Sequence, residues 1–151
     1  QVIRACACGP WTAPLIVGIC LGAQLIVEAL GGSVVEGEWV RGWRRMATDV
    51  RNTIFGGRQR VTQFQFHRNH IVRLPVGGIT IASSSRDPTE AFMVGSRIIG
   101  VGYHPEITSS DAARIYTLAG LTGDDLEGIE YQAPSREAFQ ASLAFFSALF
   151  S

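Results

Sequence analysis

Short apolar runs and amphipathic segments alternate along the first third of the chain. Leu15–Ile19 is continuously apolar and rich in β-branched residues, which predicts a strand covered on both faces, as in a parallel sheet. Gly22–Leu30 carries apolar residues at helical spacing and stops at Gly31-Gly32, a dipeptide that favours a helix end. Ser33–Val35 predicts the next strand.

Further strands are predicted in the middle of the chain. Gln63–His67 alternates polar and aromatic residues, which is typical of a strand with one buried face. Three more apolar runs are predicted to be strands: Ile79–Ser83, Ala91–Val94 and Ile98–Tyr103. These strands and the intervening helical patterns together indicate the α/β class.

Helices are predicted at both ends of the chain. Residues 2–8 have the character of a helix end. Thr108-x-x-Asp111 is a capping pattern that predicts a helix through Leu118. Ser135 is predicted to cap a last helix, and its apolar side chains fall on one predicted face: Phe139, Leu143, Phe146 and Phe150.

Composition narrows the class of protein. The 151 residues are 46% hydrophobic and 17% charged, which predicts one globular domain over residues 1–151. Thirteen basic residues balance thirteen acidic ones, so the chain is not expected to bind nucleic acid or an anionic membrane. No apolar run approaches the roughly 18 residues of a membrane span. The three cysteines do not form a disulfide framework, which favours a cytoplasmic setting.

Arginine is unevenly distributed. Every basic residue is arginine, and eight lie between Arg41 and Arg73, where Asp49 is the only acid. A solvated surface is the favoured interpretation, and a docking face for an acidic partner or substrate is the alternative.

A G-x-C-x-G pentapeptide, Gly18-Ile19-Cys20-Leu21-Gly22, joins the first strand to the first helix. This is the context of a nucleophile elbow, a sharp turn that lifts the nucleophile above the sheet. The helix N-terminus favours a thiolate there, and the Leu21 N–H faces any oxyanion formed on attack. The flanking glycines are expected because a Cβ would collide with nearby backbone. A buried cysteine in an ordinary turn is the alternative.

His104-Pro105-Glu106 follows directly after a predicted strand, where sites in α/β sheets assemble. In extended chain His104 and Glu106 face the same way, so Glu106 can orient the imidazole while its other nitrogen faces Cys20. His67 is expected to end a strand and His70 to cap a loop, which makes both weaker candidates. Cys6 and Cys8 have no second ligand pair, so no metal site is expected there.

Two segments resemble class I (triad-type) glutamine amidotransferases. Pro14–Gln24, followed by Glu28–Gly32, is similar to that family's active-site segment, and Gly100–Glu106 is similar to its second signature. The similarity extends over about residues 2–118 and is greatest to stand-alone relatives of the GMP synthase glutaminase domain. It implies a flavodoxin-like three-layer fold and hydrolysis of the L-glutamine side-chain amide to glutamate and ammonia, without a cofactor.

The resemblance also assigns roles to residues. Cys20 is the implied nucleophile, His104 the base and then the acid, and Glu106 the orienting carboxylate. Leu21 supplies an oxyanion N–H.

Substrate binding is implied at two further places. Gln24 lies near the bound glutamine in the family, and His67-Arg68-Asn69 matches a loop whose backbone holds the amino-acid end of the substrate. A synthetase that receives the ammonia is the implied partner.

Three departures from the family qualify these roles. Only 19 residues precede Cys20, whereas the family has at least one more βαβ unit there, carrying a second oxyanion donor. The chain is therefore expected to be N-terminally incomplete. Gly102 stands where the family commonly has Gln. Arg41, Arg44 and Arg45 occupy a region where relatives often keep an acidic residue.

These departures leave three functions open. The first is glutamine hydrolysis that delivers ammonia to a synthetase. The second is hydrolysis of another γ-glutamyl compound by the same three side chains. The third is a regulatory or binding role without catalysis.

Overall fold

The protein is described by a computed structural model that covers Ile3 and residues 14–122 and 136–149. Its elements follow one another as β1 (Ile16–Ile19), α2 (Leu21–Ala29), β2 (Ser33–Thr48), the 3-10 helix η1 (Thr53–Phe55), β3 (Arg60–Arg73), β4 (Gly78–Ser83), β5 (Ala91–Val94), β6 (Ile98–Val101), α3 (Ser109–Leu118) and α4 (Arg136–Leu149). The predicted α/β class is confirmed. Ile3 is helical, and the other residues of the helix end predicted over residues 2–8 lie outside the described residues, as does the Ser135 cap.

One six-stranded sheet organises the described part of the chain, in the order β1-β6-β5-β4-β2-β3. Only β1 and β6 pair in parallel; the other neighbouring strands are antiparallel. The expectation of parallel pairing therefore holds for β1, and the rest of the sheet is built from antiparallel partners.

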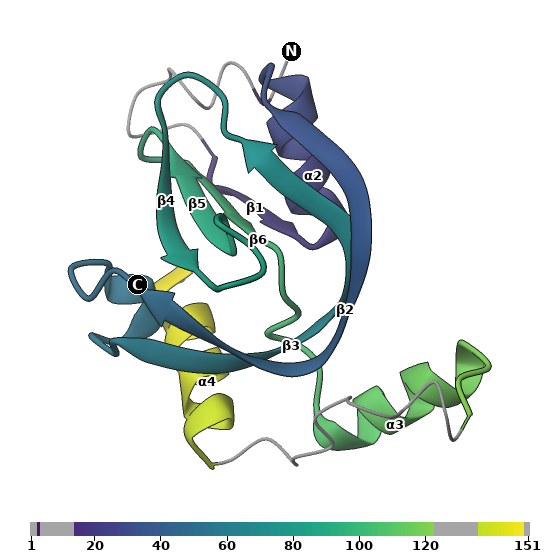
Figure 1. Ribbon diagram of the computed structural model, residues 1–151. Helices are drawn as coiled ribbons and strands as arrows, with labels where there is room; N and C mark the ends of the chain where they lie inside the picture. The colour runs from purple at the N-terminus through teal and green to yellow at the C-terminus, as the bar shows by residue number, and fades with distance from the viewer. Residues whose placement is uncertain (1–2, 4–13, 123–135, 150–151) are drawn as a thin grey trace.

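The hairpin of β2 and β3 is far longer than the two short strands predicted from Ser33–Val35 and Gln63–His67. Its two strands curve together around one side of the molecule (Figure 1). The register shifts between Glu36 and Val40, and such an irregularity bends a strand and increases its twist. The polar and glycine-containing segment 36–38 does not alternate as a half-buried strand does, so the pattern missed it.

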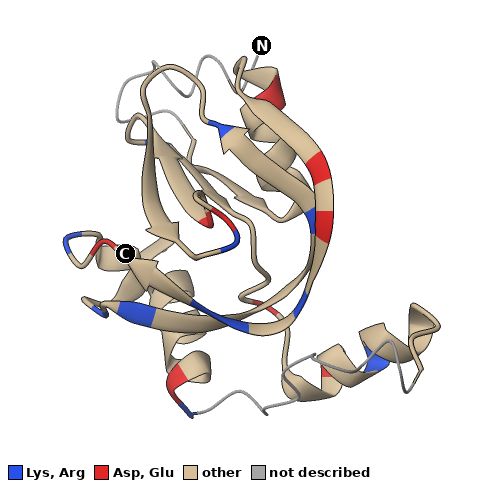
Figure 2. Ribbon diagram, in the orientation of Figure 1, with Lys and Arg blue, Asp and Glu red and all other residues tan. Residues whose placement is uncertain are grey.

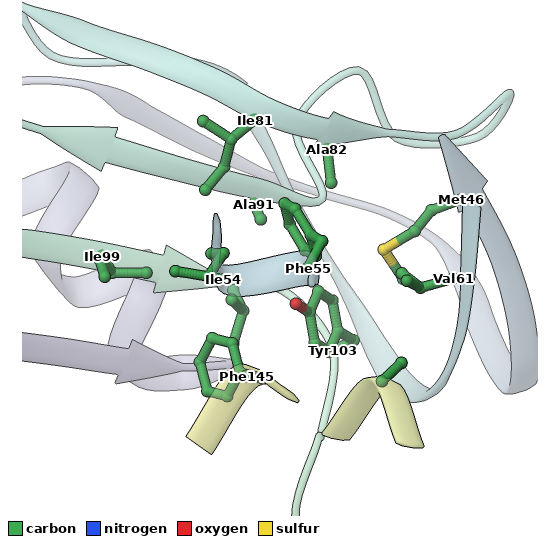
Figure 3. Packing of buried hydrophobic residues seen from close by; sticks show 12 residues of the cluster. Met46, Ile54, Phe55, Val61, Ile81, Ala82, Ala91, Ile99, Tyr103 and Phe145 are labelled. Carbon is green, nitrogen blue, oxygen red and sulfur yellow. The ribbon is translucent and has the colours of Figure 1, made fainter. Parts of the chain in front are cut away.

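Helices cover both faces of the sheet at β6. Neighbouring residues of one strand point to opposite faces, and Ile98 packs in a cluster with Ala23, Ile26 and Val27 of α2. Ile99 instead packs in the cluster that contains Phe145 of α4. Figure 3 shows this second cluster, in which η1 and α4 contribute side chains that meet those of the strands.

Two predictions about helices have different outcomes. The capping box at α3 is confirmed: the Thr108 hydroxyl accepts from the Asp111 N–H, and the Asp111 carboxylate accepts from the Thr108 N–H. The predicted shared face of α4 is present, since Phe139, Leu143 and Phe146 line one groove. This face is not the buried one, because Phe139 is 58% exposed and Leu143 51% exposed.

The buried face of α4 consists instead of Ala138, Ala141 and Phe145. Small alanines let a helix approach its neighbours closely, but they add little to an apolar pattern. Phe139 and Leu143 line a groove of about 340 Å³ that Trp43 and Pro105 also line. Phe150 lies outside the described residues.

Charged side chains follow the hairpin. Arg41, Arg44 and Arg45 lie on β2 and Arg60, Arg68 and Arg73 on β3, and Figure 2 shows basic residues along both strands. No helix in the described part of the chain is long and apolar enough to cross a bilayer.

Candidate active site

Cys20 occupies a sharp turn between β1 and α2. Its φ of 47° and ψ of −106° make it the only non-glycine residue with positive φ among those described. Such a conformation costs about 1–3 kcal/mol. The Cys20 N–H donates to the Val101 carbonyl at 2.8 Å, which carries the β1–β6 pairing one residue past the end of β1.

The two glycines around Cys20 differ in what they permit. A Cβ on Gly18 would stand 2.7 Å from the Ala23 nitrogen and 2.6 Å from Ile26 Cδ1, so this position requires glycine. A Cβ on Gly22 would meet nothing within 4 Å. The expected collision is therefore present at Gly18 and absent at Gly22, whose Cα faces open space.

Cys20 is also the N-cap of α2, and its side chain makes no capping hydrogen bond. The N–H groups of a helix's first turn have no acceptor within the helix. Leu21 is the first residue of α2, so its N–H lies one residue from the sulfur and is available to an oxyanion. The turn thus places a thiol, which can act as a nucleophile, next to a backbone N–H that can donate a hydrogen bond.

His104 reaches Cys20 because β1 and β6 are parallel neighbours. Ile19 pairs with Val101, so the chain leaves both strands at the same edge of the sheet. The His104 N–H donates to the Phe64 carbonyl at 2.8 Å, forming an isolated bridge to β3. His104 Nδ1 lies 2.7 Å from Glu106 Oε1, which leaves Nε2 as the ring nitrogen for the hydrogen bond with Cys20.

The charge state of His104 follows from these contacts. Burial disfavours the imidazolium, but hydrogen bonds and charge interactions with Cys20 and Glu106 outweigh it and raise the pKa of His104 to about 9. The imidazole therefore carries its proton at neutral pH. A thiol, an imidazolium and a carboxylate in this order have the connectivity of nucleophile, base and orienting group.

Gln24, His67 and Asn69 come together, whereas Arg68 points elsewhere. Gln24 Nε2 donates to the Asn69 carbonyl at 3.3 Å, and His67 Nδ1 lies 3.1 Å from the same oxygen. Arg68 pairs with Glu36 and lies over the Trp39 ring. The structure thus brings three of the four predicted substrate residues to one place.

The local structure around these residues differs from the prediction. His67-Arg68-Asn69 is not a loop, His67 does not end a strand, and His70 does not cap a loop, because all four residues lie within β3. The strand continues to Arg73, and in this last part Ile71 packs in the α2 cluster while its neighbours Val72 and Arg73 are exposed.

Three buried polar residues near the site were missed. Gln65 Nε2 donates to Glu90 Oε2 at 2.9 Å, and Gln65 Oε1 lies 3.1 Å from His67 Nε2. Asp87 Oδ1 lies 2.6 Å from His70 Nδ1. Burial, opposed by hydrogen bonds from Ser84 and Gln65, raises the pKa of Glu90.

A signal for this network was present in β3. Gln63, Gln65 and His67 recur at every second position, a spacing that predicts a solvent face, yet all three side chains are buried. The aromatic face is buried as well, since Phe64 packs with Tyr116 and Ala138.

A small polar cavity adjoins these residues. It has a volume of about 10 Å³, and its lining includes Gln24, His67, Asn69, Glu90 and Gly102. A Cβ on Gly102 would stand 3.5 Å from the Glu90 carbonyl oxygen and 3.8 Å from Glu90 Oε2. A Cβ at this position would therefore make only ordinary contacts with Glu90.

Comparisons with a family model and with individual proteins point to the same family. The model of the class-I glutamine amidotransferase family matches residues 12–118. A GMP synthase (glutamine-hydrolyzing) subunit from Thermococcus kodakarensis is 36% identical over 115 residues, which are 72% of this chain and 61% of that protein. The GMP synthase (glutamine-hydrolyzing) of Thermotoga petrophila is 37% identical over 93 residues, which are 61% of this chain and 18% of that protein.

Solved structures agree. A glutamine amidotransferase from Thermotoga maritima is 25% identical and superposes with a TM-score of 0.62 over 89% of this chain and 57% of that one. A glutamine amido transferase from Methylobacillus flagellatus, 19% identical, shares the fold with a TM-score of 0.69 over 99% of this chain and 61% of that one. The chain thus spans less than two thirds of the length of these relatives.

Proposed function

Because the chain belongs to the class-I glutamine amidotransferase family, we propose that it hydrolyses the side-chain amide of L-glutamine through a thioester on Cys20. The observation that carries this proposal is the contact of Cys20 with His104, which in turn contacts Glu106. The three residues come from two segments that are far apart in sequence and share one edge of the sheet.

In the first half of the reaction the Cys20 thiolate attacks the amide carbon of glutamine. The oxygen becomes an oxyanion, which the Leu21 N–H stabilises. The carbon–nitrogen bond then breaks while His104 gives its proton to the leaving nitrogen, so ammonia departs and a glutamyl thioester remains on Cys20. Glu106 holds the imidazole ring throughout, by accepting from Nδ1.

In the second half, water replaces ammonia. His104, now neutral, takes a proton from the water as its oxygen attacks the thioester carbon. The carbon–sulfur bond breaks, glutamate leaves, and the Cys20 thiolate with the His104 imidazolium is restored. One glutamine and one water are consumed for each glutamate and ammonia.

The neighbouring residues support a proposal for the substrate contacts, and the relatives support one for the fate of the ammonia. We assign the amino-acid end of glutamine to Gln24 and to the backbone of His67–Asn69, whose Asn69 carbonyl faces Gln24. We also propose that the ammonia passes to a synthetase. The relatives named GMP synthase support this assignment.

A second candidate is hydrolysis of another γ-glutamyl compound by the same three residues. It is favoured by Gly102, which lacks the side chain common in the family, and by the buried carboxyl of Glu90 nearby. Gly102 lines the small polar cavity beside Glu90, which a longer side chain at position 102 would enter.

Ammonia release from L-glutamine tests the proposal. We expect Cys20→Ala to lower turnover by at least about 10³-fold, because removing a nucleophile abolishes the covalent route. Arg51→Ala is the matched control, since Arg51 is a surface residue that pairs with its neighbour Asp49, and it should keep wild-type turnover. Full turnover by Cys20→Ala would contradict the nucleophile assignment.

A panel of γ-glutamyl amides, assayed alongside glutamine, separates the two candidates. Preference for glutamine supports the first. Preference for another amide, still lost in Cys20→Ala, supports the second. Wild-type protein that turns over neither substrate contradicts both and favours a binding role.

A further inference from the structure

His67, His70 and Asp87 converge next to the proposed glutamine-binding residues. Each offers a ligand atom, and these atoms lie within 4.8 Å of one another. The two imidazole rings stand 5.4 Å apart at 68° to each other. β3 supplies both histidines, and the connection between β4 and β5 supplies the carboxylate.

His70 directs one N–H away from the cluster, and its other ring nitrogen shares a hydrogen with Asp87. His70 Nε2 lies 2.9 Å from the Glu38 carbonyl oxygen, which only accepts, so Nε2 carries the hydrogen. Nδ1 is left facing Asp87. A Cβ on Gly37 would lie 2.8 Å from His70 Cδ2, so glycine permits this close approach. Metal-binding histidines typically donate their other N–H to such a carbonyl.

His67 faces oxygen on both sides. Nδ1 lies 3.1 Å from the Asn69 carbonyl, and Nε2 lies 3.1 Å from Gln65 Oε1. The orientation of the Gln65 amide is set by its donation to Glu90. A buried imidazole favours its neutral form, which has a single N–H. One nitrogen therefore presents a lone pair with no hydrogen to share, as a metal ligand does.

Asp87 supplies the second observation. The residue is 3% exposed, and its Oδ2 is buried without a hydrogen-bond partner among the described residues. Leaving a buried carboxylate oxygen unpaired is costly. A bound cation would satisfy this oxygen and the free nitrogen of His67 together.

From this geometry we propose that His67, His70 and Asp87 bind a divalent first-row transition metal ion of the Zn²⁺ type. Two imidazole nitrogens and one carboxylate are a donor set for such ions, whereas Mg²⁺ and Ca²⁺ prefer oxygen. The ion displaces the proton between His70 and Asp87. It would tie β3 to the β4–β5 connection and so fix the Asn69 carbonyl. No metal site was predicted from the sequence, in which Asp87 is 17 residues from His70.

Cobalt titration of a cysteine-free chain tests the site. Cys6, Cys8 and Cys20 are changed to serine, since thiolates bind the same ions. We expect this parent to bind about one Co²⁺ per chain, followed by its visible absorption, and Zn²⁺ to displace the cobalt. His70→Gln and Asp87→Asn in this parent should each weaken Co²⁺ binding by at least about tenfold.

His104→Gln in the same parent is the matched control, because it removes the third histidine of the chain and should leave the affinity unchanged. Circular dichroism checks that each variant is folded, and if Asp87→Asn is not, His70→Gln decides alone. Absence of binding by the parent, unchanged affinity in His70→Gln, or equal loss in His104→Gln overturns the proposal. The readout needs no turnover, so it stands apart from the proposed hydrolysis.

Discussion

Cys20 holds a strained backbone conformation while its sulfur contacts a charged imidazole. The strain persists because the Val101 carbonyl binds the Cys20 N–H and because Gly18 packs directly against the start of α2. The backbone conformation of Cys20 lowers the free energy of unfolding, and packing of the neighbouring strand and helix offsets that cost. Such local strain is common where backbone geometry serves chemistry.

The imidazole of His104 is expected to hold its proton to unusually high pH. The hydrogen bond to Cys20 is the largest of the contacts that raise the pKa of His104 to about 9. We expect the ring carbon signal of His104 in NMR to titrate near pH 9 in the wild-type protein. In Cys20→Ser, which lacks a thiolate, the midpoint should fall toward 6.5, the ordinary value for histidine.

His104→Gln identifies the signal by removing it. A His104 midpoint that stays near pH 9 in Cys20→Ser would show that the thiol does not stabilise the imidazolium, and the proposed order of contacts would then be wrong.

Residues within a short motif could be found from the sequence, whereas residues joined by the fold could not. Cys20 and His104 each sit in a run whose neighbours carry the pattern. Glu90 and Asp87 do not, because their partners Gln65 and His70 are 25 and 17 residues away. Only the fold of the sheet, in which β2 pairs with both β3 and β4, brings these side chains together.

At the scale of elements, Gly18 and Gly22 form a matched pair for the β1–α2 turn. Gly18→Ala should lower the free energy of unfolding by about 1–3 kcal/mol, because its Cβ collides with the α2 backbone. Gly22→Ala should be neutral or gain up to about 1 kcal/mol, because it lies in a helix with open space around it. Urea denaturation measures both, and equal losses would contradict the packing described.

α4 offers a second matched pair, one residue on each side of the helix. Phe145 is 2% exposed within the central cluster, so Phe145→Ala should cost about 3–5 kcal/mol of unfolding free energy. Phe139 is 58% exposed, and Phe139→Ala should change the stability by less than about 1 kcal/mol. Thermal unfolding of the two variants checks which face of α4 is buried. A larger loss of unfolding free energy in Phe139→Ala than in Phe145→Ala would mean that the opposite face is buried.

Helices and strands were predictable where a single hydrophobic periodicity extends over their whole length. β4, β5 and α3 have the predicted bounds to within a residue or so. β2 was missed over most of its length because charged residues and glycines interrupt its alternation. The large apolar side chains of α4 did not indicate its buried face, because Ala138 and Ala141 form much of that face.

At the scale of the whole molecule, the raised pKa of His104 makes stability depend on pH. The folded value of about 9 lies above the unfolded value of 6.5, so folding favours the protonated ring. This contribution is fully present below pH 6.5 and is lost as the pH rises through 9. We expect the unfolding free energy of wild type, relative to His104→Gln, to fall across that window.

Urea denaturation of both proteins from pH 6 to pH 10 measures this difference. A difference that grows with pH would mean that the neutral ring is the form stabilised by folding, contrary to the contacts with Cys20 and Glu106.

The topology of the sheet was only partly predictable. The apolar run of β1 indicated parallel pairing, which β6 provides. The antiparallel remainder, and the position of β3 beside His104, depend on contacts between distant segments that no local pattern encodes. The class of the fold could therefore be predicted, but its strand order could not.

The bridge between Phe64 and His104 places two demands on one strand. β3 anchors the backbone of the imidazole through a single carbonyl, and a few residues later it carries His67 and Asn69. Removing one residue between these points would turn every following side chain to the opposite face, while the imidazole kept its anchor. Under the proposed roles, exchanging side chains on this strand can change the preference among amides. A change in the length of the strand would instead displace the proposed substrate-binding residues relative to His104.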